Sequence, residues 1–211
     1  MNKLRFRYSK TGRAKYISHL DLTATMQRAF LRAGLKLKYS EGFNPHPYLS
    51  VALPLSVGCE SVCELMDAGM TDGSIPDIDS VSLPDGIKIL EIYAPERKFS
   101  EITWIEIIGK LYYNDQINNE IENKLAKRFS EKNIVISKRT KRGFIELDII
   151  QYIRDFEVIN GESIKIKMKI SAQNPSINKT DIESVLINEL KPEFITIKRI
   201  GIYDSDMLLF K

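Results

Sequence analysis

Histidine and cysteine are the residues of this chain whose side chains most often carry catalysis or metal binding. The only histidines are His19 and His46, and a histidine pair, or one histidine with a tyrosine or lysine, could supply general acid and base chemistry for RNA cleavage. The only cysteines are Cys59 and Cys63. Structural zinc sites need about four ligands, commonly in two clustered pairs, so we predict two buried thiols and no metal site.

Several catalytic motifs are missing from the sequence. It contains no P-loop, no dinucleotide-binding glycine motif, no nucleophile elbow and no His-Glu-x-x-His zinc motif. A histidine in the first turn of a helix, such as His19, is usually a surface or capping residue. We therefore predict no catalytic residue, no cofactor and no small-molecule substrate, and we favour a binding or accessory protein over a stand-alone enzyme.

A rigid loop is the most distinctive local feature, and it reads Gly42-Phe43-Asn44-Pro45-His46-Pro47. The two prolines restrict the backbone on both sides of His46. A rigid loop loses less entropy on binding, so this one could hold a binding geometry. The alternative is a stiff structural turn in which His46 bonds a backbone carbonyl.

Positive charge is concentrated in the first quarter of the chain. Residues 1–50 contain ten Lys or Arg and two acids, whereas residues 51–100 contain three Lys or Arg and nine acids, although the whole chain has a net charge of only +3. Such a basic segment indicates a polyanionic partner, or else a solvated surface that happens to be basic.

Alternating and helical patterns predict the elements that would position these residues. Leu4, Phe6 and Tyr8 alternate with polar residues and predict a strand. Ser18 with Asp21 predicts a helix start, and Gly34 its end. A strand over residues 35–39 and the loop over residues 40–47 follow. Further strands and helices repeat a similar order after residue 101.

The order strand–helix–strand–strand–helix–strand is typical of ferredoxin-like folds. We predict an α+β protein made of two tandem ferredoxin-like halves, with antiparallel sheets and added strands, over residues 1–96 and 97–211. In such a half the helices cover one face of the sheet, and the other face can bind single-stranded RNA. Leu4, Phe6 and Tyr8 would then face the helices, and Arg5 and Arg7 the open side.

The predicted nucleic-acid-binding residues are the basic, aromatic and polar side chains of this first half, although each aromatic could instead belong to the core. They are Arg5, Arg7, Arg13, Lys15, Arg28, Lys38, Tyr39, Phe43, Asn44 and His46.

The segments 16–22, 28–29, 32–35, 39–47 and 52–58 resemble the radical-SAM-linked protein family, a family of uncharacterised bacterial proteins. They read YISHLDL, RA, RAGL, YSEGFNPHP and ALPLSVG. The resemblance implies that the radical chemistry lies in a partner, a radical SAM enzyme present here as a separate chain. The sequence agrees, because it lacks the Cys-x3-Cys-x2-Cys cluster motif.

The pattern of the first half also resembles the repeat-associated RNA-processing proteins of CRISPR systems. This likeness implies a fold that holds, and sometimes cuts, RNA. The glycine-rich loop of those proteins near the C-terminus is missing, since residues 192–211 contain only Gly201.

Three functions remain open: an RNA-binding accessory protein working with a radical SAM enzyme, a metal-independent endoribonuclease, and a protein–protein adaptor that docks the enzyme without RNA. No run of ~18 apolar residues predicts a membrane span, and the N-terminal residues resemble no secretion signal. We expect a cytoplasmic protein.

Overall fold

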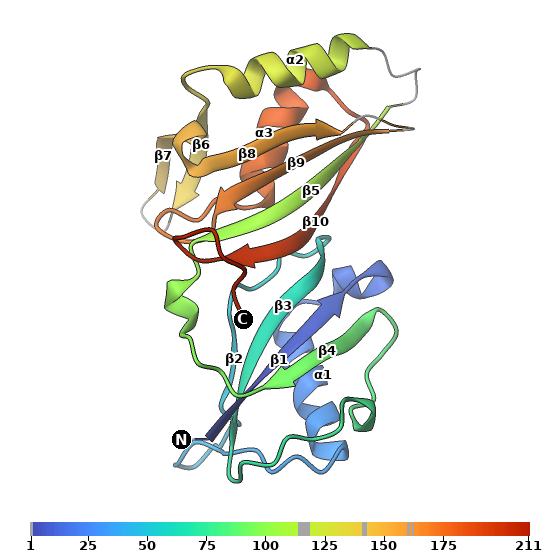
Figure 1. The fold of residues 1–211 in the computed structure, drawn as a ribbon, viewed down its shortest axis with the longest axis vertical. Helices are drawn as coiled ribbons and strands as arrows, with labels where there is room; N and C mark the ends of the chain where they lie inside the picture. Colours follow the sequence, from blue (N-terminus) through green and yellow to red (C-terminus); the bar gives the residue numbers. More distant parts are fainter. Residues whose placement is uncertain (1, 114–118, 141–142, 160, 162) are drawn as a thin grey trace. The chain divides into compact units, whose positions relative to one another are not determined.

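The computed structural model describes residues 2–113, 119–140, 143–159, 161 and 163–211. The chain divides into two compact units. Unit 1 comprises Met1–Glu101 with Lys211, and unit 2 comprises Ile102–Phe210. Each unit contains an antiparallel sheet with its helices on one face (Figure 1). The predicted α+β class with antiparallel sheets is therefore confirmed.

Unit 1 is a four-stranded sheet with one α-helix. Its elements are β1 (Asn2–Lys10), α1 (His19–Arg32), β2 (Leu49–Val51), β3 (Glu60–Met70) and β4 (Ile87–Tyr93), with 3-10 turns at Gly12–Tyr16, Ile78–Ser80 and Phe99–Glu101. The strand order is β4-β1-β3-β2, and every neighbouring pair is antiparallel.

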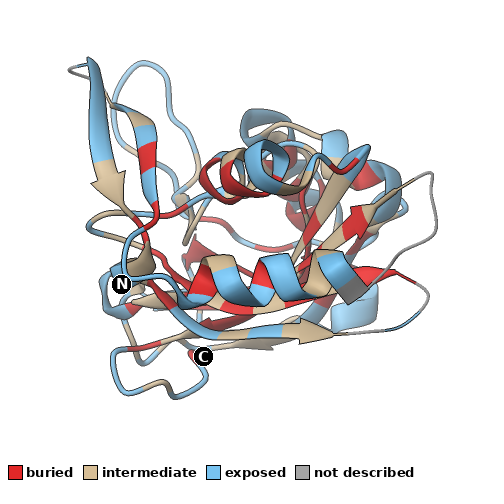
Figure 2. Ribbon diagram, turned by 90° about the horizontal axis from the view of Figure 1, so that it is seen from above, coloured by how far each residue is buried: buried red, intermediate tan, exposed pale blue. Residues whose placement is uncertain are grey.

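The core of unit 1 lies between the sheet and α1. Leu4, Phe6 and Tyr8 of β1 are buried, as the alternating pattern predicts. The ring of Phe6 stacks on that of Phe30, with centroids 4.3 Å apart. Figure 2 shows buried and exposed residues alternating along the helices. This packing fixes which face of β1 carries its arginines.

The predicted ends of α1 are confirmed. Ser18 is the N-cap, and its side chain accepts a hydrogen bond from the backbone N–H of Asp21 at 3.2 Å. The Ser18 hydroxyl also donates to the Asp21 carboxylate at 2.7 Å. Gly34 follows the C-cap with a φ of +78°, a conformation that L side chains rarely adopt.

Unit 2 has the same strand order with two α-helices and an extra hairpin. Its elements are β5 (Trp104–Tyr112), α2 (Asn119–Ser130), β6 (Val135–Thr140), β7 (Gly143–Asp148), a 3-10 turn (Ile150–Tyr152), β8 (Ile153–Ile159), β9 (Ile164–Ser171), α3 (Lys179–Leu190) and β10 (Phe194–Tyr203). The sheet order is β10-β5-β9-β8, all antiparallel, and β6 and β7 pair separately.

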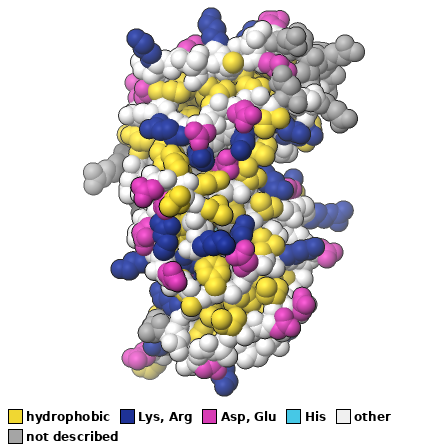
Figure 3. Space-filling view, in the orientation of Figure 1, with side chains coloured by type: hydrophobic (Ala, Val, Ile, Leu, Met, Phe, Trp, Pro, Cys, Tyr) yellow, Lys and Arg dark blue, Asp and Glu magenta, His cyan; other side chains and the backbone are white. Residues whose placement is uncertain are grey.

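Alternate residues of the unit 2 strands are buried and half-exposed. The helices α2 and α3 cover one face of this sheet (Figure 1). No helix of the described residues covers the other face, and Figure 3 shows hydrophobic, basic and acidic side chains interleaved on it. We call it the open face of unit 2.

The strand predicted over residues 35–39 is wrong. Leu37 and Tyr39 form only isolated bridges, with Met70 and Pro47 respectively. The segment touches the end of β3 only around Met70, and from Tyr39 onward it pairs with the loop that follows, so no continuous ladder forms. Among the described residues no helix has the length and hydropathy that a membrane span requires.

Candidate nucleic-acid interface

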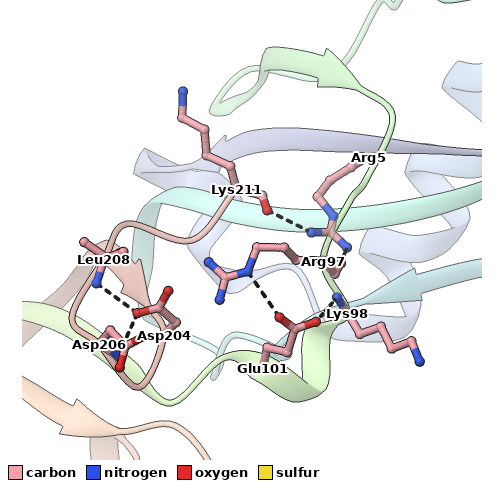
Figure 4. Close-up of polar contacts among 8 residues, drawn as sticks. All are labelled: Arg5, Arg97, Lys98, Glu101, Asp204, Asp206, Leu208 and Lys211. Atoms are coloured by element: carbon pink, nitrogen blue, oxygen red, sulfur yellow. Dashed lines mark hydrogen bonds and ion pairs between the residues drawn. The ribbon is translucent and has the colours of Figure 1, made fainter.

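The position of Arg5 contradicts the expectation that it faces solvent. Its side chain is fully buried and forms a bidentate ion pair with Asp67, with N–O distances of 2.7 and 3.0 Å. The guanidinium also donates to the carbonyls of Arg97 at 2.8 Å and Lys211 at 3.3 Å (Figure 4). It lies 4.3 Å from the ring centroid of Phe99. Arg5 therefore stabilises unit 1 and is removed from the predicted interface.

Arg7 lies on the same side of β1 but remains half-exposed. Its Nη1 donates to the carboxylate of Glu91 on β4 at 2.7 Å. A phosphate would have to compete with this carboxylate, so Arg7 is a weaker candidate than an unpaired cation would be.

Residues 38–48 form an ordered hairpin-like loop, which we call the Phe43 loop. Tyr39 bridges to Pro47, the N–H of Ser40 donates to the His46 carbonyl at 2.9 Å, and the N–H of Tyr48 donates to the Lys38 carbonyl at 2.9 Å. The base of the loop is anchored to Gly69 of β3 by two hydrogen bonds of 2.8 Å. The backbone is thus held in one shape before any ligand binds.

Ser40 and His46 close this loop through their side chains as well. The Ser40 Oγ accepts from the backbone N–H of His46 at 3.1 Å and lies 3.1 Å from its Nδ1. The Nδ1 atom also lies 3.4 Å from the carbonyl oxygen of Asn44. His46 therefore has a structural role in the loop, while its ring remains exposed.

The aromatic side chains of the Phe43 loop project into solvent instead of joining the core. Phe43 is fully exposed, and Tyr39 and Tyr48 are 37% and 43% exposed. Leaving a whole phenyl ring in water costs about 1.5–3 kcal/mol relative to burying it. Asn44 is exposed at the same tip. An exposed ring on an ordered loop is the feature that base stacking requires.

Among the predicted cations, Lys38 lies at the base of this loop, which bonds to Gly69 opposite Lys3, whereas Arg13 and Lys15 follow the other end of β1 at Lys10. Arg13, Arg28 and Lys38 are exposed, and within the described ranges no carboxylate lies in ion-pair distance of these three. Lys15 is half-exposed, 3.9 Å from a carboxylate oxygen of Glu60 and 5.4 Å from the ring centroid of Tyr16. The predicted basic residues other than Arg5 are thus at least partly accessible.

A buried polar group at the end of β1 was not anticipated from the sequence. Lys10 is 1% exposed and donates to the Ile17 carbonyl at 2.6 Å, with buried Glu64 and Cys59 near it. Burial lowers the pKa of the Lys10 ammonium, and the nearby charge of Glu64 counteracts that shift. The bond to Ile17 ties β1 to the turn that carries Arg13 and Lys15. A bulge between Tyr8 and Lys10 breaks the alternation that would have revealed the burial.

The two cysteines are free thiols and both are buried, as predicted. Within the described part of the chain no group of three or more His, Cys, Asp or Glu side chains could hold a metal ion. His19 lies exposed at the first residue of α1, and its ring has no hydrogen bond to another described residue.

Fold and surface together define a two-unit α+β protein whose unit 1 presents an exposed aromatic loop and several accessible cations. Residues 3–179 match the model of a family described as an uncharacterized protein conserved in bacteria, DUF2344, and the chain belongs to this family. No curated protein is significantly similar in sequence.

A chain in the crystal structure of a Cbf5-Nop10-Gar1 complex is similar in fold, with a TM-score of 0.49 and 11% sequence identity. The match covers 92% of this chain and 48% of that chain, so this protein spans about half the length of its structural neighbour. A similarity of this size carries no functional argument.

Proposed function

We propose that this protein binds single-stranded RNA through the Phe43 loop and the accessible cations of unit 1, as an accessory to a radical SAM enzyme. The observation that carries the RNA part is the fully exposed ring of Phe43 on a loop closed by Ser40 and His46. Bases stack on such rings while cations contact phosphates. The proposed interface comprises Arg7, Arg13, Lys15, Arg28, Lys38, Tyr39, Phe43, Asn44 and His46.

The partner enzyme is inferred from the family resemblance of segments 16–22, 28–29, 32–35, 39–47 and 52–58. The last two of these include most of the Phe43 loop and the stretch just after β2. If these segments mark the shared function, the same surface serves both the RNA and the enzyme that modifies it.

We further infer that both units are variants of the ferredoxin-like fold. Taken in chain order, the four sheet strands of each unit lie in the order 4-1-3-2. In unit 2 the elements follow strand–helix–strand–strand–helix–strand once β6 and β7 are set aside. In unit 1 the 3-10 turn Ile78–Ser80 stands where a second helix would lie. The fold supports RNA binding by analogy alone.

The test is the affinity for a fluorescein-labelled RNA 12-mer of mixed sequence, measured by anisotropy at low salt with chelator. Phe43→Ala should weaken binding about 10-fold, because one stacked base contributes about 1–3 kcal/mol. The matched control is Phe144→Ala, since Phe144 is 73% exposed on β7 of unit 2. Equal affinities of the two variants would contradict the proposal.

The same samples separate the other two functions. RNA that is shortened on a gel after the titration would favour the endoribonuclease. Copurification with the radical SAM enzyme is then measured after nuclease treatment. The adaptor is favoured if Phe43→Ala abolishes this copurification but leaves RNA binding normal.

A further inference from the structure

We propose that the open face of unit 2 is a second binding site, for single-stranded nucleic acid, independent of the Phe43 loop. Its side chains come from β5, β8, β9 and β10, and the pairing of these strands places them in rows. They are aromatic residues that could stack on bases and basic residues that could contact phosphates. The aromatic members are Trp104, Tyr112, Phe194 and Tyr203, and the basic members Lys110, Arg154, Lys165, Lys167, Lys169 and Lys198.

Two pairs of aromatic residues mark the ends of the β5–β10 ladder. Tyr203 lies directly opposite Trp104, and Phe194 lies directly opposite Tyr112. The rings of Tyr112 and Phe194 are stacked, with centroids 4.1 Å apart and planes 12° apart. Phe194 remains 54% exposed. Tyr112 lies eight positions after Trp104 on β5, so the two pairs lie about 26 Å apart along the strand.

The ring of Tyr203 packs over Gly201. A Cβ atom at Gly201 would lie only 2.6 Å from its Cε2 atom, so the ring occupies the space that a side chain at Gly201 would fill. The Tyr203 hydroxyl donates to Glu106 at 2.8 Å, and the ammonium of Lys169 lies 4.8 Å from the ring centroid. A ring held in this way loses little entropy when a base stacks on it.

The cations of this face are arranged in a way that disfavours the unliganded sheet. Lys110 lies directly opposite Lys165, and Arg154 lies directly opposite Lys169. Like charges in directly opposed positions destabilise a sheet. Asp155 offsets one of these pairs through its ion pair with Lys169 at 2.6 Å. An anionic backbone between Lys110 and Lys165 would relieve the other repulsion.

Carboxylates on this face neutralise only part of the charge. Glu106 pairs with Lys167 at 3.1 Å, and Glu157 lies opposite Lys167 on β8. With Asp155 these are three acids against six basic residues. An aromatic surface with net positive charge fits a polyanion that carries flat bases better than it fits an acidic protein surface.

The chain contains one tryptophan, and Trp104 lies on this face, with the guanidinium of Arg154 5.1 Å from its ring centroid. Its fluorescence therefore reports on the open face of unit 2. Titrating the whole protein with an unlabelled uridine 12-mer at low salt should quench Trp104 in a saturable way. A thymidine 12-mer titrated in parallel distinguishes RNA from single-stranded DNA as the ligand. Tighter binding of the uridine 12-mer would identify the ligand as RNA, and equal binding would show that the face accepts any single strand.

Lys110→Ala with Lys165→Ala should weaken the quenching titration about 10-fold. The slope of log affinity against log salt should fall by about 1.4, because each phosphate contact on a single strand contributes about 0.7. The control with the same charge change is Lys127→Ala with Lys132→Ala, two exposed residues in and just after α2. Equal loss of affinity in both double variants would overturn the proposal.

Tyr203→Ala should also weaken the quenching titration, whereas Tyr203→Phe, which keeps the ring and loses only the hydroxyl, should restore most of the affinity. Circular dichroism melts show whether each variant is folded. If the Lys110→Ala, Lys165→Ala double variant melts like the wild type and binds single strands with unchanged affinity, the proposed site is also overturned. Phe43→Ala should leave the Trp104 titration unaltered. The experiments therefore distinguish a failure of the proposal for the Phe43 loop from a failure of the proposal for the open face of unit 2.

Discussion

Arg5 and Arg7 lie two residues apart on β1, yet their surroundings give them different roles. Arg5 and Asp67 are buried, with side-chain exposures of 1% and 11%, whereas Arg7 and Glu91 are 27% and 39% exposed. A buried pair that loses one partner leaves an uncompensated charge, but a half-exposed pair is replaced by water. The same residue type is therefore structural at position 5 and available to a ligand at position 7.

This difference predicts the stability of two matched variants. Asp67→Ala should lower the free energy of unfolding by about 3–5 kcal/mol, because Arg5 would remain buried without its carboxylate. Glu91→Ala should lower it by no more than about 1 kcal/mol. Urea denaturation followed by circular dichroism measures both. Losses of similar size would show that Arg5 is far more hydrated than its contacts indicate.

At the scale of elements, the opposed lysines on the open face of unit 2 should lower the stability of the sheet while favouring the binding of an anionic ligand. Lys110 and Lys165 are directly opposed on β5 and β9. Lys165→Glu would replace this repulsion by a cross-strand ion pair, and an opposite-charge pair contributes about 0.2–1 kcal/mol. We expect the variant to be more stable than the wild type in urea and to bind single strands more weakly.

The control for this prediction is Lys132→Glu, because Lys132 is exposed in the turn after α2. A surface change of this kind should alter stability by no more than about 0.5 kcal/mol. If Lys165→Glu destabilised unit 2, the lysine would be stabilised by its own surroundings and would not need an anion.

The sequence predicts these elements better than it predicts their surfaces. The alternation of Leu4, Phe6 and Tyr8 and the capping at Ser18 are local patterns, and both are confirmed. The burial of Arg5 depends on Asp67, which is 62 residues away, and no local pattern encodes such a pairing. The strand predicted at residues 35–39 failed because its bridges are divided between β3, at Met70, and the loop that follows, at Pro47.

The open face of unit 2 escaped the sequence analysis for a related reason. Its lysines are spread over three strands that the chain visits at positions 110, 165 to 169 and 198, and only the strand register brings them together. The net charge of a continuous segment does not reveal these lysines, because one face of a sheet carries every second residue of several strands. Alternating lysines at 165, 167 and 169 were the one local signal available.

At the scale of the whole molecule, the net charge is only +3, so general attraction to nucleic acid is weak. Specific binding must then depend on the exposed rings of the two proposed surfaces. Bases in a duplex are stacked on each other and present no free face to a side chain. We therefore expect the protein to bind a single-stranded RNA at least about 10-fold more tightly than a duplex of the same length, which is one stacked base at about 1–3 kcal/mol.

A competition experiment separates the contribution of the cations to RNA binding from the contribution of the aromatic rings. Anisotropy of a labelled single strand, displaced by unlabelled single-stranded or duplex RNA at the same phosphate concentration, measures the preference directly. Removing rings by combining Phe43→Ala with Tyr203→Ala should reduce the preference towards unity while changing duplex binding little. If the duplex competes as well as the single strand, the cations alone account for binding and the aromatic residues have another purpose.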